Sequence, residues 1–295
     1  MPEPLEFTGE RFTPECVREI WYEHLHRYAW AAGLVGGLRV LDAACGEGYG
    51  SALLARSASS VAGVDLSAEA IRHAQERYRG EGLEFHAADC LDLPFGDAEF
   101  DCVVSFETLE HLADQERLLS EFSRVLKPDG FLVLSSPDKA VYTDRQQNCN
   151  EYHVRELYRN ELESLLGTVF PARRLWGQKL VFQSAIWSLE PRPGTLLQQE
   201  DQGRVSALKA PGHDPVYFIA LCARDEAHLP DAGHGLSLFD DAADSVYEHY
   251  YHEIRKNMAA GELLAARDRE INELKSRLDG AGAPPPWWRR LFGGR

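Results

Sequence analysis

Four carboxylates stand at the ends of successive apolar stretches: Asp42, Asp65, Asp89 and Glu107. If these stretches form a parallel sheet, their carboxyl ends meet at one edge, which is where ligands bind in such folds. Carboxylates at that edge attract cationic groups and accept hydrogen bonds from hydroxyl and amino groups. The spacing therefore predicts a pocket for a ligand that carries both positive charge and hydrogen-bond donors.

A glycine-rich turn, Gly46-Glu47-Gly48-Tyr49-Gly50, follows the first stretch and opens a helix. Glycine lets the backbone turn sharply and approach a ligand closely. Dinucleotide-binding loops read G-x-G-x-x-G and place backbone N–H groups against a pyrophosphate. Here Ser51 replaces the third glycine, and Glu47 and Asp42 bring negative charge that disfavours a pyrophosphate. S-adenosylmethionine fits better, because its ammonium and sulfonium groups are positive.

Asp65 and Asp89 are the predicted acceptors for the rest of this ligand. Asp65 lies near the offset of ~20 residues from a glycine turn at which an acidic residue meets a ribose. Asp89 ends the next apolar stretch and is placed to accept from the adenine amino group. Three strand ends that carry carboxylates are a stronger signal than the glycines alone.

Alternating strand and helix patterns position these side chains. Strands are predicted at 38–45, 60–66, 83–89, 100–106 and 130–136, and helices at 49–57, 68–79 and 114–126. This alternation predicts an α/β fold with a parallel sheet and helices on both faces. A further helix at 154–166 and strands at 169–176 and 216–223 are expected to complete it.

The motifs of these stretches resemble the class I S-adenosylmethionine-dependent methyltransferases. The likeness rests on five segments in order: Val40 to Gly50, Gly63 to Asp65, Ala88 to Phe95, Phe100 to Glu107 and Arg124 to Gly130. It implies a Rossmann-like, seven-stranded methyltransferase sheet with S-adenosyl-L-methionine as cofactor. The residues that it assigns to cofactor binding are Arg27, Asp42, Ala44, Cys45, Gly46, Gly48, Asp65, Leu66, Asp89, Cys90, Leu91 and Phe106.

A narrower resemblance lies near the N-terminus. The segments Thr8 to Glu15 and Glu23 to Tyr28 look like bacterial methyltransferases associated with surface-glycan synthesis. An apolar stripe predicts a helix at 16–33. By this resemblance, residues 1–36 form a helical lid over the cofactor, with Arg11 and Arg27 as candidates to contact a carboxylate. The alternative is an amphipathic helix with solvated charges.

The segment Glu107-Thr108-Leu109-Glu110-His111 follows the fourth strand, where an acceptor would approach the methyl group. A sugar hydroxyl is a weak nucleophile and needs a general base. His111 is the first choice, because an imidazole with a pKa of about 6.5 is largely neutral near pH 7. Glu107 is predicted to orient His111 or to contact the substrate. The alternative is that His111 only braces the loop.

Three further histidines are alternatives to His111 as the base. His153 follows the fifth strand and is the second choice, while His24 and His26 belong to the N-terminal helix. No metal-ligand spacing stands out among these residues, so no metal is predicted.

Charge and cysteine content bound the class of function. The 295-residue chain has a formal net charge of −16. Because nucleic-acid binders concentrate Lys and Arg, nucleic acid is not expected as a substrate. The six cysteines form no CxxC pair, which argues against a zinc site or disulfide framework and favours a reduced, cytoplasmic setting. No signal-peptide pattern or apolar run of ~20 residues is found.

Four parts are predicted along the chain: the lid at 1–36, a methyltransferase domain at 37–225 with an insertion at 177–214, a helical extension at 226–283 and a Trp/Arg tail at 284–295. The insertion is predicted to recognise substrate, because long excursions in compact domains are usually functional or disordered. In the extension, Leu264, Ile271 and Leu278 keep a seven-residue spacing that favours a coiled coil and a homodimer. Tryptophans beside arginines in the tail favour contact with the inner face of a membrane or with a partner protein, against a disordered tail.

The first functional hypothesis is methyl transfer to a sugar hydroxyl of a glycan or glycoconjugate. The N-terminal likeness and the tail support it. One alternative is a small-molecule O- or N-methyltransferase of natural-product synthesis, and another is a non-catalytic cofactor-binding scaffold that recruits partners.

Overall fold

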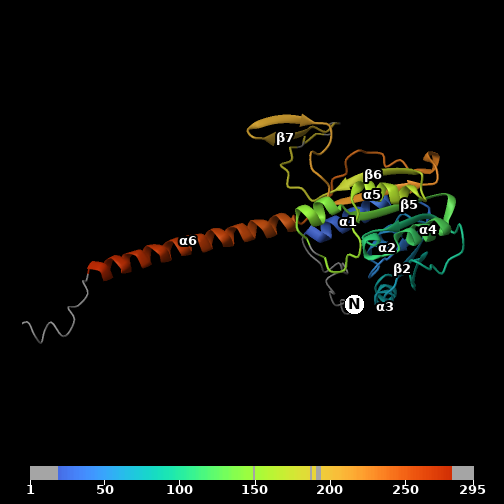
Figure 1. The fold of residues 1–295 in the computed structure, drawn as a ribbon, viewed down its shortest axis with the longest axis horizontal. Helices are drawn as coiled ribbons and strands as arrows, with labels where there is room; N and C mark the ends of the chain where they lie inside the picture. Colours follow the sequence, from blue (N-terminus) through green and yellow to red (C-terminus); the bar gives the residue numbers. More distant parts are fainter. Residues whose placement is uncertain (1–18, 149, 187, 191–193, 281–295) are drawn as a thin grey trace, which may run out of the picture. The chain divides into compact units, whose positions relative to one another are not determined.

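The computed structural model describes residues 19–148, 150–186, 188–190 and 194–280 (Figure 1). It divides into two compact units, Met1–Asp240 and Asp241–Arg295, and each is described by itself. Two predicted features lie outside the described residues: the Thr8 to Glu15 motif with Arg11, and the Trp/Arg tail at 284–295.

A seven-stranded sheet in the order β3-β2-β1-β4-β5-β9-β6 forms the core of the first unit. Its strands are β1 Arg39–Ala43, β2 Ser60–Asp65, β3 Leu83–Ala87, β4 Phe100–Ser105, β5 Leu126–Pro137, β6 Ala172–Gln178 and β9 Tyr217–Ala223. Strands β1 to β5 pair in parallel, whereas β9 runs antiparallel to both β5 and β6. The predicted α/β, Rossmann-like sheet is thereby confirmed. Its chain order reverses between β1 and β4, the position at which doubly wound folds bind ligands.

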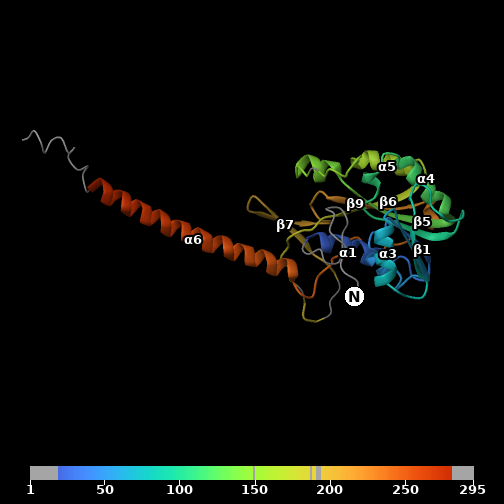
Figure 2. The ribbon, with the colours of Figure 1, turned by 90° about the horizontal axis from the view of Figure 1, so that it is seen from below.

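Helices cover both faces of this sheet. They are α1 Glu19–Ala32, α2 Tyr49–Leu54, α3 Ala68–Arg77, α4 Gln115–Val125 and α5 Arg159–Gly167. Because successive strand residues face opposite sides, Leu41 joins the core cluster with α4 and α5, while Val40 joins the cluster with α1 and α2. Figure 2 shows α4 and α5 on one side of the sheet and α1 and α3 on the other.

Two element boundaries differ from the sequence prediction. β5 was predicted to begin at residue 130, but it begins at Leu126, the predicted last residue of the preceding helix, and its pairing with β4 has a register shift between Phe100 and Cys102. The helix predicted from residue 154 begins only at Arg159. The expected first turn of this helix does not form, because the backbone N–H groups of Val154 and Arg155 donate to the carbonyl of Glu110.

The insertion at 177–214 contains a hairpin that the sequence analysis missed. Its strands are β7 Leu197–Asp201 and β8 Arg204–Leu208, which pair with each other in a separate two-stranded sheet. The two turn residues, Gln202 and Gly203, have φ angles of 49° and 80°. Positive φ at both positions matches the twist of a hairpin, and glycine adopts it at no steric cost.

Residues 226–240 lie against α1 in the first unit, although the prediction grouped them with the helical extension. Leu229 is buried in the same core cluster as Tyr28, and the Phe239 ring stacks on His26 with centroids 5.2 Å apart. A proline at position 230 and glycines at 233 and 235 disfavour a helix here.

The described helix of the second unit is α6, Ser245–Gly280, which lies within the predicted extension at 226–283. Its apolar residues Leu264, Ile271 and Leu278 are exposed, with 65%, 46% and 79% of their surface accessible. Across the described helices, no segment is both long and apolar enough to span a bilayer.

Candidate active site

The glycine turn after β1 has a left-handed backbone conformation at three positions. Ala44, Gly46 and Gly48 all have positive φ, at 61°, 56° and 90°. A Cβ on Gly48 would lie 2.7 Å from the Phe85 ring, so only glycine allows this close approach. The positive φ of Ala44 costs of order 1 kcal/mol, and backbone strain of this kind is typical of functional turns. The turn therefore presents backbone rather than side chains at the ligand edge.

Asp65 lies beside this turn at the end of β2. Its Oδ2 accepts from the backbone N–H of Gly46 at 3.0 Å, and its Oδ1 accepts from that of Ser67 at 2.8 Å. Each carboxylate oxygen can accept a further hydrogen bond. The next residue, Leu66, is 76% exposed and gives the same edge an apolar surface. Asp65 is thus fixed in place with acceptor capacity left for a hydroxyl-bearing ligand.

Asp89 and Leu91 follow β3 on the same edge. Asp89 is exposed, and its Oδ1 accepts from the backbone N–H of Leu91 at 2.8 Å. Cys90 between them is buried in the core, and burial raises the pKa of its thiol to about 12. The Asp89 carboxylate is therefore open to a ligand, while the Cys90 thiol is not an ionisable group near neutral pH.

Asp42 is fully buried and is engaged by the protein itself. The Tyr28 hydroxyl donates to Oδ1 at 3.1 Å, and the Ser51 hydroxyl donates to Oδ2 at 2.6 Å. Burial raises the pKa of Asp42 to about 7, although the hydrogen bonds from Ser51 and Tyr28 lower it. These contacts tie α1 and α2 to β1.

Glu47 also has protein partners. Its fully buried carboxylate accepts from the Tyr78 hydroxyl at 2.8 Å and lies 3.2 Å from His73 Nε2 and 3.5 Å from Arg77 Nη1. The Glu47 charge, expected to face a cationic ligand, is directed to the end of α3 instead.

Arg27 on α1 carries a buried guanidinium, only 1% exposed. Its Nη1 donates to Glu107 Oε1 at 3.3 Å and to Gln178 Oε1 at 3.2 Å, and the group lies over the Tyr217 ring. Its Nε and Nη2 are buried and have no acceptor among the residues that the structure describes. Buried donors are nearly always satisfied, so the three N–H groups of these two nitrogens are candidates to bind a ligand carboxylate.

Cys45 and Phe106 are packed rather than open. Cys45 is 2% exposed, and burial raises the pKa of its thiol well above the usual value. The Phe106 ring is 6% exposed and packs edge-on against Tyr28 with centroids 4.9 Å apart. Both residues support the walls of the site, and their predicted contact with the cofactor stays a prediction.

Glu107 is held in a strained backbone conformation with a φ of 50°. The Ser135 hydroxyl donates to its Oε1 at 2.6 Å and accepts from its backbone N–H at 3.1 Å. Together with Arg27, these contacts direct the carboxylate toward β5 and α1. The structure thus gives Glu107 different partners from His111, which it was expected to orient.

The two candidate bases, His111 and His153, lie side by side with ring centroids 5.0 Å apart. His111 Nδ1 is 3.1 Å from the carbonyl oxygen of Tyr152, and His153 Nδ1 is 2.6 Å from Glu156 Oε1. A carbonyl and a carboxylate only accept, so in each neutral ring Nδ1 carries the proton and Nε2 carries the lone pair.

Glu110 is the residue that the sequence analysis passed over. It belongs to a short 3₁₀ turn, Leu109–His111, and its side chain is fully buried. A carboxylate oxygen of Glu110 and one ring nitrogen each of His111 and His153 all lie within 4.8 Å of one another. The adjacent acid and histidine after β4 were a signal in the sequence, but nothing local shows that residue 153 returns to them.

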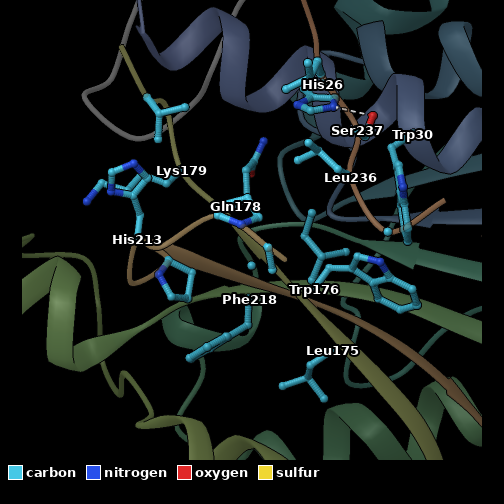
Figure 3. Close-up of a pocket in the computed structure, with 18 of the residues that line it drawn as sticks. His26, Trp30, Leu175, Trp176, Gln178, Lys179, His213, Phe218, Leu236 and Ser237 are labelled. Atoms are coloured by element: carbon cyan, nitrogen blue, oxygen red, sulfur yellow. Dashed lines mark hydrogen bonds between the residues drawn. The ribbon is translucent and has the colours of Figure 1, made fainter. Parts of the chain in front are cut away.

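A pocket of about 520 Å³ adjoins this edge of the sheet, between α1, β6, β9 and residues 234–238 (Figure 3). The indole rings of Trp30 and Trp176 form part of its wall, with centroids 5.3 Å apart. His26, Gln178 and His213 add polar groups from three different segments. Residues of the insertion at 177–214 also line it.

The other two candidate bases, His24 and His26, have partners of their own. His26 lines the pocket, where its Nε2 is 2.9 Å from the Ser237 hydroxyl. His24 Nδ1 is 3.3 Å from the Tyr49 hydroxyl, and burial lowers the pKa of His24 well below its usual value.

The residues at this edge fit S-adenosylmethionine. The Nε and Nη2 donors of Arg27 suit the carboxylate of the cofactor. Asp65 suits the ribose hydroxyls, and Asp89 suits the adenine amino group. The exposed Leu66 offers the adenine ring an apolar contact. We expect these residues to hold the cofactor.

Comparison with known proteins bears on the same region. The methyltransferase domain family matches residues 41–134. A probable S-adenosylmethionine-dependent methyltransferase of Mycolicibacterium smegmatis is 37% identical over 171 residues, which cover 57% of this chain and 66% of that protein. A fatty-acid O-methyltransferase of the same species is 33% identical over 164 residues, which cover 49% of this chain and 60% of that protein. The chain therefore covers just under two thirds of these relatives at most.

Solved structures share the fold. An S-adenosylmethionine-dependent methyltransferase of Thermotoga maritima, described as a possible histamine N-methyltransferase, superposes with a TM-score of 0.51 at 19% identity, covering 69% of this chain and 90% of that one. At this identity the likeness concerns the fold alone. Residues 41–134 thus match a methyltransferase domain, and the chain is similar over 171 residues to a protein named as a probable S-adenosylmethionine-dependent methyltransferase.

Proposed function

We propose that this protein transfers the methyl group of S-adenosylmethionine to a hydroxyl oxygen of a sugar, in a glycan or glycoconjugate. The observation that carries the proposal is the pair of rings of His111 and His153, with centroids 5.0 Å apart, in the segments that follow β4 and β5. A hydroxyl has to lose its proton during methylation, so an acceptor of this class needs such a cluster.

The adjoining pocket supports a sugar as acceptor. Trp30 and Trp176 provide flat apolar surfaces, while His26 and His213 bring imidazole groups to the same pocket. A saccharide presents both apolar C–H faces and hydroxyl groups, so it can use both kinds of surface.

The residues of the site have distinct parts in this reaction. When bound, S-adenosylmethionine supplies an electrophilic methyl group on a positively charged sulfur. Arg27, Asp65 and Asp89 would position the cofactor, and correct alignment of the reacting groups is the main source of acceleration in such a displacement. The histidine cluster would activate the hydroxyl. Glu107, which is fixed by Ser135 and Arg27, would limit the direction from which the acceptor approaches.

Three other functions are candidates. The relative named fatty-acid O-methyltransferase favours a fatty acid as acceptor. A small molecule of natural-product synthesis is a second possible acceptor. A carboxylate is already ionised at neutral pH and needs no base. A fatty-acid methyltransferase would therefore lose little turnover when the histidines are replaced. A cofactor-binding scaffold would transfer no methyl group at all.

Labelled S-adenosylmethionine can separate these readings. The full-length protein would be incubated in parallel with cell-envelope saccharide fractions and with long-chain fatty acids, and label in the products counted. We expect label in the saccharides, lost on His111→Ala with His153→Ala. Label confined to fatty acids would reject the sugar acceptor, and cofactor binding without any transfer would favour the scaffold.

The other finer expectations are also proposals. The exposed seven-residue spacing of Leu264, Ile271 and Leu278 on α6 supports pairing with a second copy of the chain. We place the protein in the cytoplasm, with the tail at 284–295 contacting the inner face of the membrane or a partner protein. The tryptophans and arginines of that segment support this contact.

A further inference from the structure

We propose that Glu110, His111 and His153 bind a first-row divalent metal ion, such as Zn²⁺ or Mn²⁺. One ligand atom from each residue lies within 4.8 Å of the other two. Two imidazoles and one carboxylate form a donor set that suits Zn²⁺, Fe²⁺ and related ions, and it leaves coordination positions open for substrate. The inference rests on the proposed function only for its role in catalysis.

Nδ1 of each ring faces an acceptor, which is the carbonyl of Tyr152 for His111 and the Glu156 carboxylate for His153. A neutral ring that donates from Nδ1 keeps its lone pair on Nε2, which is the nitrogen that a metal would take. Metal-binding histidines characteristically use the second ring nitrogen in this way, to a carbonyl or a carboxylate.

The backbone holds the three donors together although 43 positions separate the first from the last in the sequence. The carbonyl of Glu110 accepts from the N–H groups of Val154 at 2.8 Å and Arg155 at 3.0 Å. These bonds clamp the loop that carries His153 onto the turn that carries Glu110. The cluster is thus built by two neighbouring segments and not by a chance contact of long side chains.

Burial and distance are consistent with an open site. Glu110 is fully buried, while His153 is 8% and His111 is 28% exposed, so the cluster faces solvent on one side. His111 Nε2 is 4.0 Å from Glu110 Oε1. Donors to one ion at ~2.1 Å lie at most ~4.2 Å apart, so binding needs only small rotations of the side chains.

A metal here would explain how the site activates a hydroxyl. A hydroxyl bound to a divalent ion loses its proton more readily, as metal-bound water does. The acceptor oxygen would release its proton to solvent on the exposed side of His111 and receive the methyl group in its place. His111 and His153, which the sequence analysis assigned as alternative bases, then act as metal ligands.

Metal binding can be measured without any acceptor. The full-length protein, stripped with EDTA and dialysed, would be titrated with Zn²⁺, Mn²⁺ and Mg²⁺ in a calorimeter. We expect one equivalent of Zn²⁺ or Mn²⁺ to bind, and Mg²⁺ to bind at least tenfold more weakly because it prefers an all-oxygen set. Glu110→Gln and His153→Asn should each lower Zn²⁺ affinity at least tenfold.

The controls separate a lost ligand from a lost fold. His228→Asn alters another histidine that lies 3.1 Å from a carboxylate, Asp225, and should leave metal binding unchanged. Glu156→Ala removes the partner of His153 and should weaken metal binding about 10–100-fold. Affinity for S-adenosylmethionine, unchanged in His153→Asn, would show that this variant is folded.

The outcomes distinguish this inference from the proposed function. Absence of stoichiometric Zn²⁺ or Mn²⁺ binding, or equal binding in native protein and in folded His153→Asn, overturns the metal site. Methyl transfer that persists in EDTA overturns the catalytic role of the metal, while leaving a sugar methyltransferase intact. Stoichiometric binding with no transfer to saccharides supports the metal site and rejects the sugar acceptor.

Discussion

The buried Asp42 carboxylate makes the stability of the fold depend on pH, and Asp42→Asn should remove that dependence. Burial raises the pKa of Asp42 from 3.8 to about 7, with the hydrogen bonds from Ser51 and Tyr28 acting in the opposite direction. In the unfolded chain the carboxyl ionises near its ordinary pKa. Ionisation therefore stabilises the unfolded state more than the folded state. The stability that the folded protein has from a protonated Asp42 is fully present below the unfolded pKa and is lost as pH rises through about 7.

The size of the effect follows from this difference in pKa. A shift of about 3 units corresponds to about 4 kcal/mol over the whole range, and to about 2.5 kcal/mol between pH 5 and pH 8. We expect the free energy of unfolding of the native protein to fall by that amount relative to Asp42→Asn. The asparagine keeps the shape, and it can accept from Tyr28 while donating to Ser51.

Urea unfolding, followed by tryptophan fluorescence at several pH values without cofactor, measures this difference. Asp101→Asn is a control of opposite sign. Partial burial opposes ionisation of Asp101, but hydrogen bonds from Lys127 and the Arg39 backbone lower its pKa overall. Its contribution is present above the unfolded pKa and is lost as pH falls. If native protein and Asp42→Asn give parallel stability curves from pH 5 to pH 8, the raised pKa of Asp42 is refuted.

Three further predictions concern the turn, the cofactor and α6. Gly50→Ala places a Cβ 2.1 Å from the Tyr28 ring and should cost about 1–3 kcal/mol in urea unfolding, whereas Gly36→Ala, with no atom within 4 Å, should be nearly neutral. Asp65→Ala should abolish S-adenosylmethionine binding in calorimetry, and unchanged affinity would overturn its ribose role. Ile271→Glu, in the exposed stripe of α6, should convert a dimer to a monomer by light scattering, and a native protein that is already monomeric would reject the pairing.

Most of the sheet was predictable because its strands are buried on both faces and read as continuous apolar runs between helices. The strands at 60–65 and 217–223 lie within one residue of their predicted bounds. What the local pattern missed depends on tertiary contacts. The segment 226–240 packs on α1 through Leu229 and Phe239, and its partners lie roughly 200 positions earlier in the sequence.

The candidate site shows the same division. The positions of Asp65 and Asp89 at the ligand edge follow from strand periodicity and topology alone. The meeting of Glu110 with His153 does not, because it depends on backbone hydrogen bonds between two loops. Spacing along the chain therefore gave no sign of a metal-ligand set, although each of its members was visible in the sequence.

The acids of the ligand edge divide into two groups that sequence alone could not separate. Asp42 is fully buried and hydrogen-bonded by Tyr28 and Ser51, and burial raises its pKa to about 7. Glu47 is also fully buried, accepts from Tyr78 and lies near Arg77. A buried carboxylate that is held by protein groups offers little to a ligand. Only carboxylates with acceptor capacity left at the edge can select a cation or a hydroxyl. Recognition of the cofactor should therefore depend on the directed hydrogen bonds of the strand-end carboxylates, and not on the summed negative charge of the glycine turn.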